Sequence, residues 1–250
     1  MAGVDPKDYK QVVDACTLCD LCFMTKCPYV PPHEWALDFP HLMLRYRAAE
    51  LKAGKDDKIG AQITETDRNG RLGALAAPIA NAANANSAAR AFMESTIGVD
   101  HRAALPKFNG RTFVLRAMEE KPEVDRLAPA YGRKAVLYAT CFVNYNNPEI
   151  GTAARAVLAK NGVETEIVYP RCCGMPQLEQ GDLKAVADSA KATARDLKPW
   201  IDKGYDIIAL VPSCALMLKF EWPLIVPGDP EVKRLAQATF DVAEYVVDIA

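Results

Sequence analysis

The chain has 250 residues, of which half are hydrophobic and a quarter are charged, and its formal net charge is −2. This length and composition predict a folded core, in one large domain or two modest ones. Acidic and basic residues are interspersed, and no basic stripe with interleaved aromatic residues is present, so we expect no nucleic-acid partner.

Neither a targeting segment nor a membrane span is evident. The first residues, MAGVDPKDYKQVVDAC, are too polar for a secretory signal. The longest apolar stretch, Ile207 to Leu218, is interrupted by Pro212 and Ser213 and is too short to span a bilayer. We therefore expect a cytoplasmic protein, at most peripheral at the inner face of a membrane, whose membrane contact goes through a partner.

The eight cysteines form two groups, separated by a cysteine-free middle of the chain. Because no signal peptide is evident, this grouping favours metal or redox chemistry over a disulfide framework. It also divides the chain into three expected parts. These are a cluster-binding module at residues 1–39, a helical connecting region at 40–130 and a cysteine-rich α/β domain at 131–250.

The first group, here called the N-terminal cysteine group, consists of Cys16, Cys19, Cys22 and Cys27. Its first three members are spaced as in overlapping CxxC steps, and a Cys-Pro follows after four intervening residues. Such spacing lets four thiolates converge on a [4Fe-4S] cluster, although the last gap is one residue longer than in bacterial ferredoxins. Structural zinc also binds four thiolates, but usually through two separated CxxC pairs. We therefore predict an iron–sulfur cluster on these four cysteines.

The middle of the chain is predicted to be mainly helical. Pro40 can open a helix, and apolar residues follow it at helical spacing. The stretch from Ala74 to Phe92 mixes strong and weak helix formers, and the polar segment 56–70 is predicted to be partly loop. We assign no chemistry to this region and expect it to pack between two functional ends.

The last part alternates strand and helix patterns. Apolar or alternating runs predict three strands, and stripes at helical spacing predict the helices between and after them. In chain order, the expected elements are a strand at 134–139, a helix at 150–158, a strand at 163–169, a helix at 183–201, a strand at 205–211 and a final helix at 242–249. This order implies a three-layer α/β domain with a parallel sheet.

Each predicted strand is followed by cysteine. Cys141 follows the first strand, Cys172 and Cys173 follow the second, and Cys214 follows the third. Because the carboxyl ends of parallel strands meet at one edge of a sheet, these four thiols, here called the sheet-edge cysteine group, should converge on a second cluster or a zinc ion. Gly174, which lacks a Cβ, would let the backbone approach a bulky cluster. A strained vicinal disulfide and unrelated core thiols are the other interpretations of the adjacent pair.

These segments resemble a known family. Thr140-Cys141, Arg171-Cys172-Cys173-Gly174 and Pro212-Ser213-Cys214 are similar to the cysteine-rich CCG domain of heterodisulfide-reductase-related Fe–S oxidoreductases. In that family an N-terminal ferredoxin-like module often precedes the CCG domain, as the N-terminal cysteine group does here. Because one chain carries both modules, the layout resembles the branch that includes the iron–sulfur subunit of anaerobic glycerol-3-phosphate dehydrogenase.

The chain departs from the family pattern at three points. Val211 stands where the family's last CxxC has its first cysteine. One CCG half and one ferredoxin-type motif are present, where the family commonly has two of each. We therefore expect the sequence to be a fragment that lacks residues at both ends.

The resemblance implies an iron–sulfur electron-transfer subunit of an oxidoreductase complex. It would pass electrons between a flavoprotein dehydrogenase and a quinone or disulfide acceptor. One alternative is a heterodisulfide-reductase-like catalytic subunit that cleaves a disulfide at the CCG site. A zinc-binding, non-redox scaffold is the other, and no catalytic residue is predicted.

Overall fold

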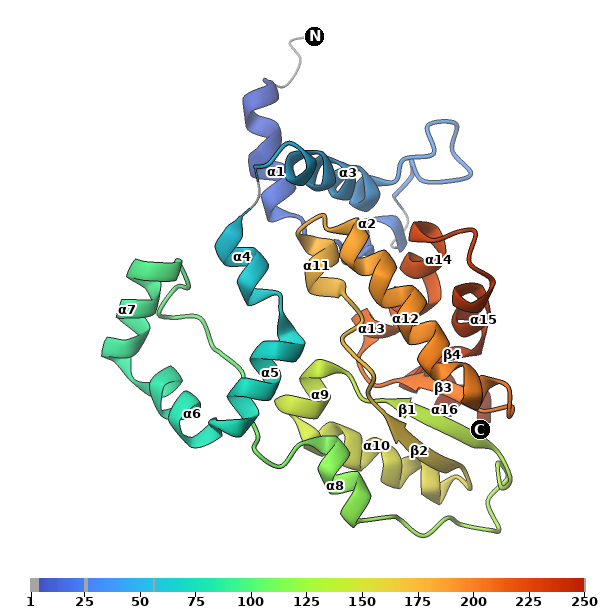
Figure 1. Cartoon of the computed structure of the whole chain (residues 1–250). Coiled ribbons are helices and arrows are strands. Elements are labelled where there is room, and N and C mark those ends of the chain that lie inside the picture. Colours follow the sequence, from blue (N-terminus) through green and yellow to red (C-terminus); the bar gives the residue numbers. More distant parts are fainter. Residues whose placement is uncertain (1–4, 25–26, 56, 250) are drawn as a thin grey trace.

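The computed structural model describes residues 5–24, 27–55 and 57–249. The fold is α/β and contains a four-stranded, fully parallel sheet with the strand order β2-β1-β3-β4 (Figure 1). Its strands are β1 (Lys134–Tyr138), β2 (Glu164–Val168), β3 (Asp206–Ala209) and β4 (Thr239–Asp241). In register, Leu137 of the central strand β1 pairs with Ile167 on one side and Ile208 on the other.

The sequence predicted most of this domain correctly. The three expected strands are β1, β2 and β3, and the expected helices are α10 (Pro148–Lys160), α12 (Leu183–Ile201) and α16 (Val242–Ile249). Strand β4 was not predicted, because a three-residue strand is too short to show an alternating pattern. From β1 the chain runs first to β2 on one side and later to β3 on the other, so the topology reverses between β1 and β3.

Helices cover both faces of the sheet, which confirms the three-layer architecture. Alternate residues of each strand point to opposite faces. Val136 and Ile207 belong to a core with helices α12 and α15 (Pro230–Ala238), whereas Leu137 and Ile208 belong to a second core with α8 (Phe113–Glu119), α10 and α16.

The beginning of the chain packs on the first of these cores. It forms a 3₁₀ turn (Pro6–Asp8) and helices α1 (Tyr9–Ala15), α2 (Leu21–Met24) and α3 (Phe39–Lys52). Val13 and Leu18 are buried in the same cluster as Cys172, Cys173 and Cys214. The two cysteine groups therefore border one continuous hydrophobic core.

The middle of the chain is more helical than predicted. It forms α4 (Lys58–Ile63), α5 (Thr66–Leu75), α6 (Ala77–Ala85) and α7 (Ser87–Ile97), and α6 and α7 extend away from the sheet (Figure 1). Within the described residues of the segment predicted to be partly loop, which exclude residue 56, only 57, 64 and 65 lie outside helices. The polar Asp57 accepts a hydrogen bond from the Ile59 N–H at 3.0 Å, so it caps α4 rather than breaking the helix.

The remaining elements surround the carboxyl ends of the strands. They are α9 (Cys141–Tyr145), α11 (Met175–Glu179), α13 (Pro212–Leu216), a π-helical segment (Met217–Glu221) and α14 (Trp222–Ile225). Of the helices in the described part of the chain, none has the length and apolar composition needed to cross a bilayer.

Candidate metal centre

The sheet-edge cysteine group gathers as the sequence predicted. Cys141 is the first residue of α9, which Thr140 caps by accepting the Val143 N–H at 3.2 Å. The Sγ atoms of Cys141 and Cys172 lie 3.7 Å apart, and those of Cys173 and Cys214 lie 3.3 Å apart. Three crossovers of the sheet thus deliver four thiols to one edge.

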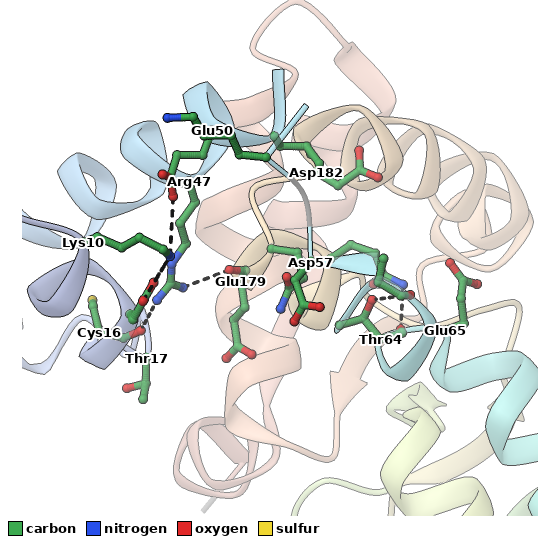
Figure 2. Close-up of a pocket in the computed structure, with 16 residues that line it drawn as sticks. Lys10, Cys16, Thr17, Arg47, Glu50, Asp57, Thr64, Glu65, Glu179 and Asp182 are labelled. Atoms are coloured by element: carbon green, nitrogen blue, oxygen red, sulfur yellow. Dashed lines mark hydrogen bonds and ion pairs between the residues drawn. The ribbon is translucent and has the colours of Figure 1, made fainter. Parts of the chain in front are cut away.

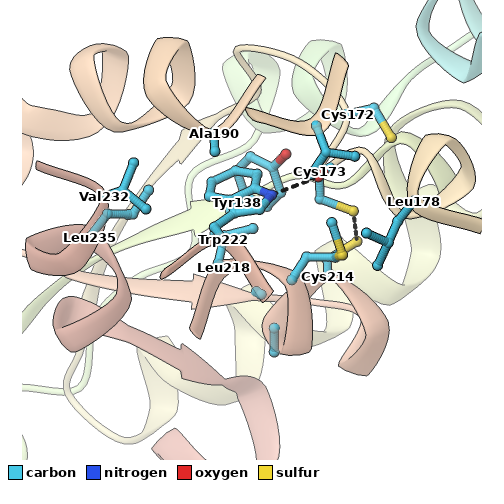
Figure 3. Close-up of a cluster of buried hydrophobic side chains, with 14 of the residues drawn as sticks. Tyr138, Cys172, Cys173, Leu178, Ala190, Cys214, Leu218, Trp222, Val232 and Leu235 are labelled. Atoms are coloured by element: carbon cyan, nitrogen blue, oxygen red, sulfur yellow. Dashed lines mark hydrogen bonds between the residues drawn. The ribbon is translucent and has the colours of Figure 1, made fainter. Parts of the chain in front are cut away.

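The turn that carries the vicinal pair is held by buried hydrogen bonds. Ser189 Oγ donates to the Cys172 carbonyl at 3.0 Å, and Trp222 Nε1 donates to the Cys173 carbonyl at 3.1 Å (Figure 3). Gly174 has a φ of +84°, a left-handed conformation that favours glycine, and its N–H points to Cys172 Sγ at 3.5 Å. The sequence drew attention to Gly174, but it gave no sign of the bonds from Ser189 and Trp222.

Burial and mutual hydrogen bonding shift the acidity of these thiols. Cys172, Cys173 and Cys214 are only 6%, 2% and 5% exposed. Hydrogen bonds from Cys141 and Cys173 stabilise the thiolate of Cys172 and hold its pKa far below the usual value. The same hydrogen bonds, together with burial, raise the pKa of Cys141 and Cys173. Negative charge therefore concentrates on Cys172, and thiolates are the form of cysteine that binds metals.

The four sulfurs do not form a compact tetrahedron. The two close pairs are joined through the adjacent Cys172 and Cys173. Among the described residues, no three of these sulfurs lie within 4.8 Å of one another.

The middle of the chain also reaches this group, which the sequence did not predict. Asp67, near the start of α5, accepts the Cys172 N–H at 2.8 Å and the hydroxyl hydrogen of Tyr169. The Thr66 hydroxyl acts to lower the pKa of both Cys141 and Cys172. The sequence shows no sign of these contacts, because Thr66-Asp67 resembles an ordinary helix start until its tertiary contacts are known.

The N-terminal cysteine group lies on a tightly curved loop around α2. Cys16 and Cys27 are partly buried, whereas Cys19 and Cys22 are exposed. Leu18 and Asp20 have positive φ values of +50° and +57°, and such left-handed conformations are costly for residues with a Cβ. Strained backbone of this kind is often found at ligand sites.

Cys19 has an environment that favours its thiolate. The Leu21 N–H and the Thr17 hydroxyl donate hydrogen bonds to its sulfur and lower its pKa. As placed, no three sulfurs of the N-terminal cysteine group lie within 4.8 Å of one another in the part of the chain that the structure describes. Because Cys19 and Cys22 are exposed and no cysteine of the sheet-edge group is, the N-terminal cysteine group is the more open of the two.

Arg47 of α3 connects the two cysteine-bearing regions. Its guanidinium donates to the carbonyl oxygen of Val13 at 2.6 Å. It also donates to the carbonyl oxygens of Cys16 at 2.5 Å and Glu179 at 2.9 Å (Figure 2). Glu179 ends α11, the helix that follows the Cys172-Cys173-Gly174 turn. A polar cavity of about 680 Å³ lies beside this junction, and Cys16 is among its lining residues.

A second connection passes through His41. Its Nδ1 lies 2.6 Å from Asp38, and its Nε2 lies 3.2 Å from the buried carboxylate of Glu221. The hydrogen bond to Glu221, followed by the interactions with Asp38, raises the pKa of His41 to about 9 against the cost of burial. Glu221 closes the π-helical segment that follows Cys214, so this ion pair also joins the N-terminal part to the α/β domain.

Comparison with known proteins identifies the same region. Residues 135–219 match the family "CCG: Cysteine-rich domain". Over 169 residues the chain is 27% identical to the C subunit of anaerobic glycerol-3-phosphate dehydrogenase from Escherichia coli K12, a match that covers 67% of this chain and 42% of that protein. Over 121 residues it is 32% identical to lactate utilization protein A from Geobacillus kaustophilus and 28% identical to that of Bacillus subtilis.

The match to each lactate utilization protein covers 46% of this chain and just under half of the relative, 48% and 49% respectively. The chain thus spans less than half the length of the curated relatives described here. No solved structure is significantly similar to it.

Proposed function

We propose that this chain is an iron–sulfur electron-transfer subunit of an oxidoreductase. The proposal starts from its cysteine-rich CCG domain and from its homology to the C subunit of anaerobic glycerol-3-phosphate dehydrogenase and to lactate utilization protein A. The observation that carries this proposal is the convergence of four thiols at one sheet edge inside the CCG domain. Residues 1–39, 40–130 and 131–250 would act as its cluster module, connecting region and cysteine-rich domain.

The N-terminal cysteine group would hold a [4Fe-4S] cluster. The overlapping CxxC spacing supports this assignment, as do the left-handed residues Leu18 and Asp20, which curve the loop. The hydrogen bonds to Cys19 favour its thiolate form. Because Cys19 and Cys22 are exposed, a redox partner could approach a cluster at this end of the protein closely.

The sheet-edge cysteine group fits a second cluster better than a zinc ion. Tetrahedral zinc with bonds of about 2.3 Å to sulfur needs all four sulfurs about 3.8 Å from one another. The sheet-edge sulfurs approach one another only in pairs, at 3.7 and 3.3 Å, and no three of them lie within 4.8 Å among the described residues. In addition, the buried Thr66 hydroxyl lies beside Cys141 and Cys172 without a well-formed hydrogen bond in the described structure, so it can serve a bound cluster.

Iron–sulfur clusters on these thiolates would supply one-electron chemistry. The protein would surround the inner site with low-polarity side chains, exclude water and fix the ligand turn through Ser189 and Trp222. Because Cys172, Cys173 and Cys214 are almost fully buried, they are poorly placed to meet a disulfide substrate directly. Burial therefore favours electron transfer over disulfide cleavage.

The partners belong to the same proposal. Homology to part of a dehydrogenase supports a flavoprotein dehydrogenase as the electron donor or acceptor on one side. A quinone or a disulfide would be the acceptor on the other side. Contact with a membrane would be made through a partner.

Anaerobic purification followed by iron, zinc and acid-labile sulfide analysis tests the proposal. We expect a brown protein with iron and sulfide in similar amounts and more iron than one [4Fe-4S] cluster contains. A colourless protein with stoichiometric zinc would refute the redox function and support the scaffold alternative. Iron sufficient for one cluster alone would refute the second site.

A further inference from the structure

The N-terminus of helix α5 lies against the sheet-edge cysteine group, although the two are far apart in the chain. Asp67 and Cys172, which share a hydrogen bond of 2.8 Å, are separated by 105 residues. Helix α5 belongs to the middle of the chain and lies outside the matched CCG region, which begins at residue 135. Its contact with the cysteines is therefore a feature of this chain that the CCG motif does not describe.

Two glycines of α5 allow this helix to pack closely on its neighbours. A Cβ on Gly70 would overlap the ring of Tyr145, and one on Gly73 would overlap the ring of Phe108. Tyr145 ends helix α9, which begins at Cys141. The contact between Gly70 and Tyr145 thus packs α5 against the helix that begins at Cys141.

Asp67 holds the turn that carries the vicinal cysteines. One of its carboxylate oxygens accepts the Cys172 N–H, and the other accepts the Tyr169 hydroxyl hydrogen. Tyr169 follows strand β2, so the carboxylate bridges the end of that strand and the cysteine turn. It also places a negative charge beside the thiols.

Thr66 contributes a buried hydroxyl beside the thiols of Cys141 and Cys172. It lies close enough to both sulfurs to lower their pKa, yet no well-formed hydrogen bond satisfies its Oγ1 among the described residues. The hydroxyl is not used to cap the helix, since Glu65 is the capping residue and the Thr66 N–H bonds to the Thr64 carbonyl at 2.8 Å. A buried hydroxyl without a well-formed hydrogen bond costs free energy and calls for a functional explanation.

We propose that Thr66 and Asp67 are positioning residues that tune the sheet-edge cluster site. Thr66 donates to the metal-bound sulfur of Cys141 or Cys172, and Asp67 fixes the Cys172 turn while adding negative charge. This inference rests on the proposed function, because it requires a redox cluster at that site. A hydrogen bond to a cluster sulfur stabilises the reduced state, whereas a nearby carboxylate destabilises it. The two residues therefore shift the reduction potential in opposite directions.

Redox titration of the purified protein, followed by EPR, tests these directions. Thr66→Val should move the midpoint potential of the sheet-edge cluster to a more negative value, and Thr66→Ser should restore it. Asp67→Asn should move the same potential to a more positive value. Thr96→Val is the matched control, because Thr96 is exposed on α7 and its hydroxyl bonds to the Phe92 carbonyl.

Equal potentials in Thr66→Val and Thr96→Val would overturn the role of Thr66. Shifts of the same sign in the Thr66 and Asp67 variants would overturn the electrostatic account. If Thr66→Val takes up no cluster, the Thr66→Ser variant decides the question. A cluster with the wild-type potential in Thr66→Ser supports the role of the hydroxyl. If Thr66→Ser also binds no cluster, the role of Thr66 is purely steric.

A cluster-free measurement separates this inference from the proposed function. In metal-free protein, Asp67→Ala should make the Cys172 amide exchange with deuterium about tenfold faster, since a hydrogen bond to a charged acceptor is lost. Unchanged exchange would refute the positioning role of Asp67. If the wild-type protein binds no cluster at the sheet edge, the proposed function fails, while this exchange measurement still decides whether Asp67 holds the turn.

Discussion

The two cysteine groups are built in opposite ways. The N-terminal cysteine group lies within one short, partly exposed loop, where local backbone turns determine the positions of the thiols. The sheet-edge cysteine group draws on three separate chain segments, and three of its four thiols are buried in the core of the α/β domain. Damage at the first group should therefore stay local, whereas damage at the second should also affect the stability of the fold.

The largest expected effect comes from replacing a buried thiol. In Cys173→Ser a hydroxyl would occupy a site that is 2% exposed, which should lower the free energy of unfolding by about 3 kcal/mol. Chemical denaturation of the metal-free protein measures this loss. Cys19→Ser is the matched exposed replacement and should leave the unfolding midpoint unchanged. Equal effects of the two variants would contradict the contrast between the groups.

The docking of α5 gives the next largest effect. Gly70→Ala should destabilise the protein by about 2 kcal/mol, because the new Cβ overlaps the Tyr145 ring and outweighs the helix propensity gained from alanine. Thermal unfolding measures the change. Gly228→Ala is the control, since a Cβ there meets nothing within 4 Å. A Gly70→Ala protein as stable as this control would show that α5 does not pack tightly on α9.

The ion pair of His41 with Glu221 predicts a pH dependence. Because folding raises the pKa of His41 from 6.5 to about 9, its contribution is fully present below pH 6.5 and is lost as the pH rises through about 9. We expect wild-type protein to lose about 1–2 kcal/mol more stability than His41→Gln between pH 6 and pH 10. Denaturation curves at both pH values measure the difference, and parallel losses would contradict it.

Arg47 gives the smallest effect, because it connects the two regions without lying in either core. Arg47→Lys should cost about 1 kcal/mol, since an ammonium group cannot reach three carbonyl oxygens in the way that the planar guanidinium does. Limited proteolysis should cut the N-terminal segment faster in this variant. Arg126→Lys serves as the control, because Arg126 lies on the exposed segment before β1. Equal cleavage rates in the two variants would argue against a connecting role.

Elements with strong, uninterrupted patterns could be predicted from the sequence. Helix α12 begins and ends where its apolar stripe does, and the alternation along β2 marks that strand. The convergence of the sheet-edge cysteine group followed from the rule that parallel strands end at one edge. These predictions required only local pattern and chain topology.

Features that depend on tertiary contact could not be predicted in this way. The described part of the polar segment, residues 57–70, is mostly helical because Asp57 caps one helix and the next one docks on α9 through Gly70. The contacts of Thr66 and Asp67 with the cysteines exist only once that docking is in place. Nothing in the local spacing of these residues distinguishes them from a solvated helix start.

The most direct test of the central claim is EPR of the anaerobically purified and reduced protein, with wild type compared to Cys19→Ser and Cys173→Ser. Two independent iron–sulfur sites predict two distinguishable signals in the wild type. Cys19→Ser should remove one signal and keep the other, and Cys173→Ser should do the reverse. A single signal that both variants abolish, or one that both leave intact, would contradict the assignment of the two cysteine groups to separate clusters.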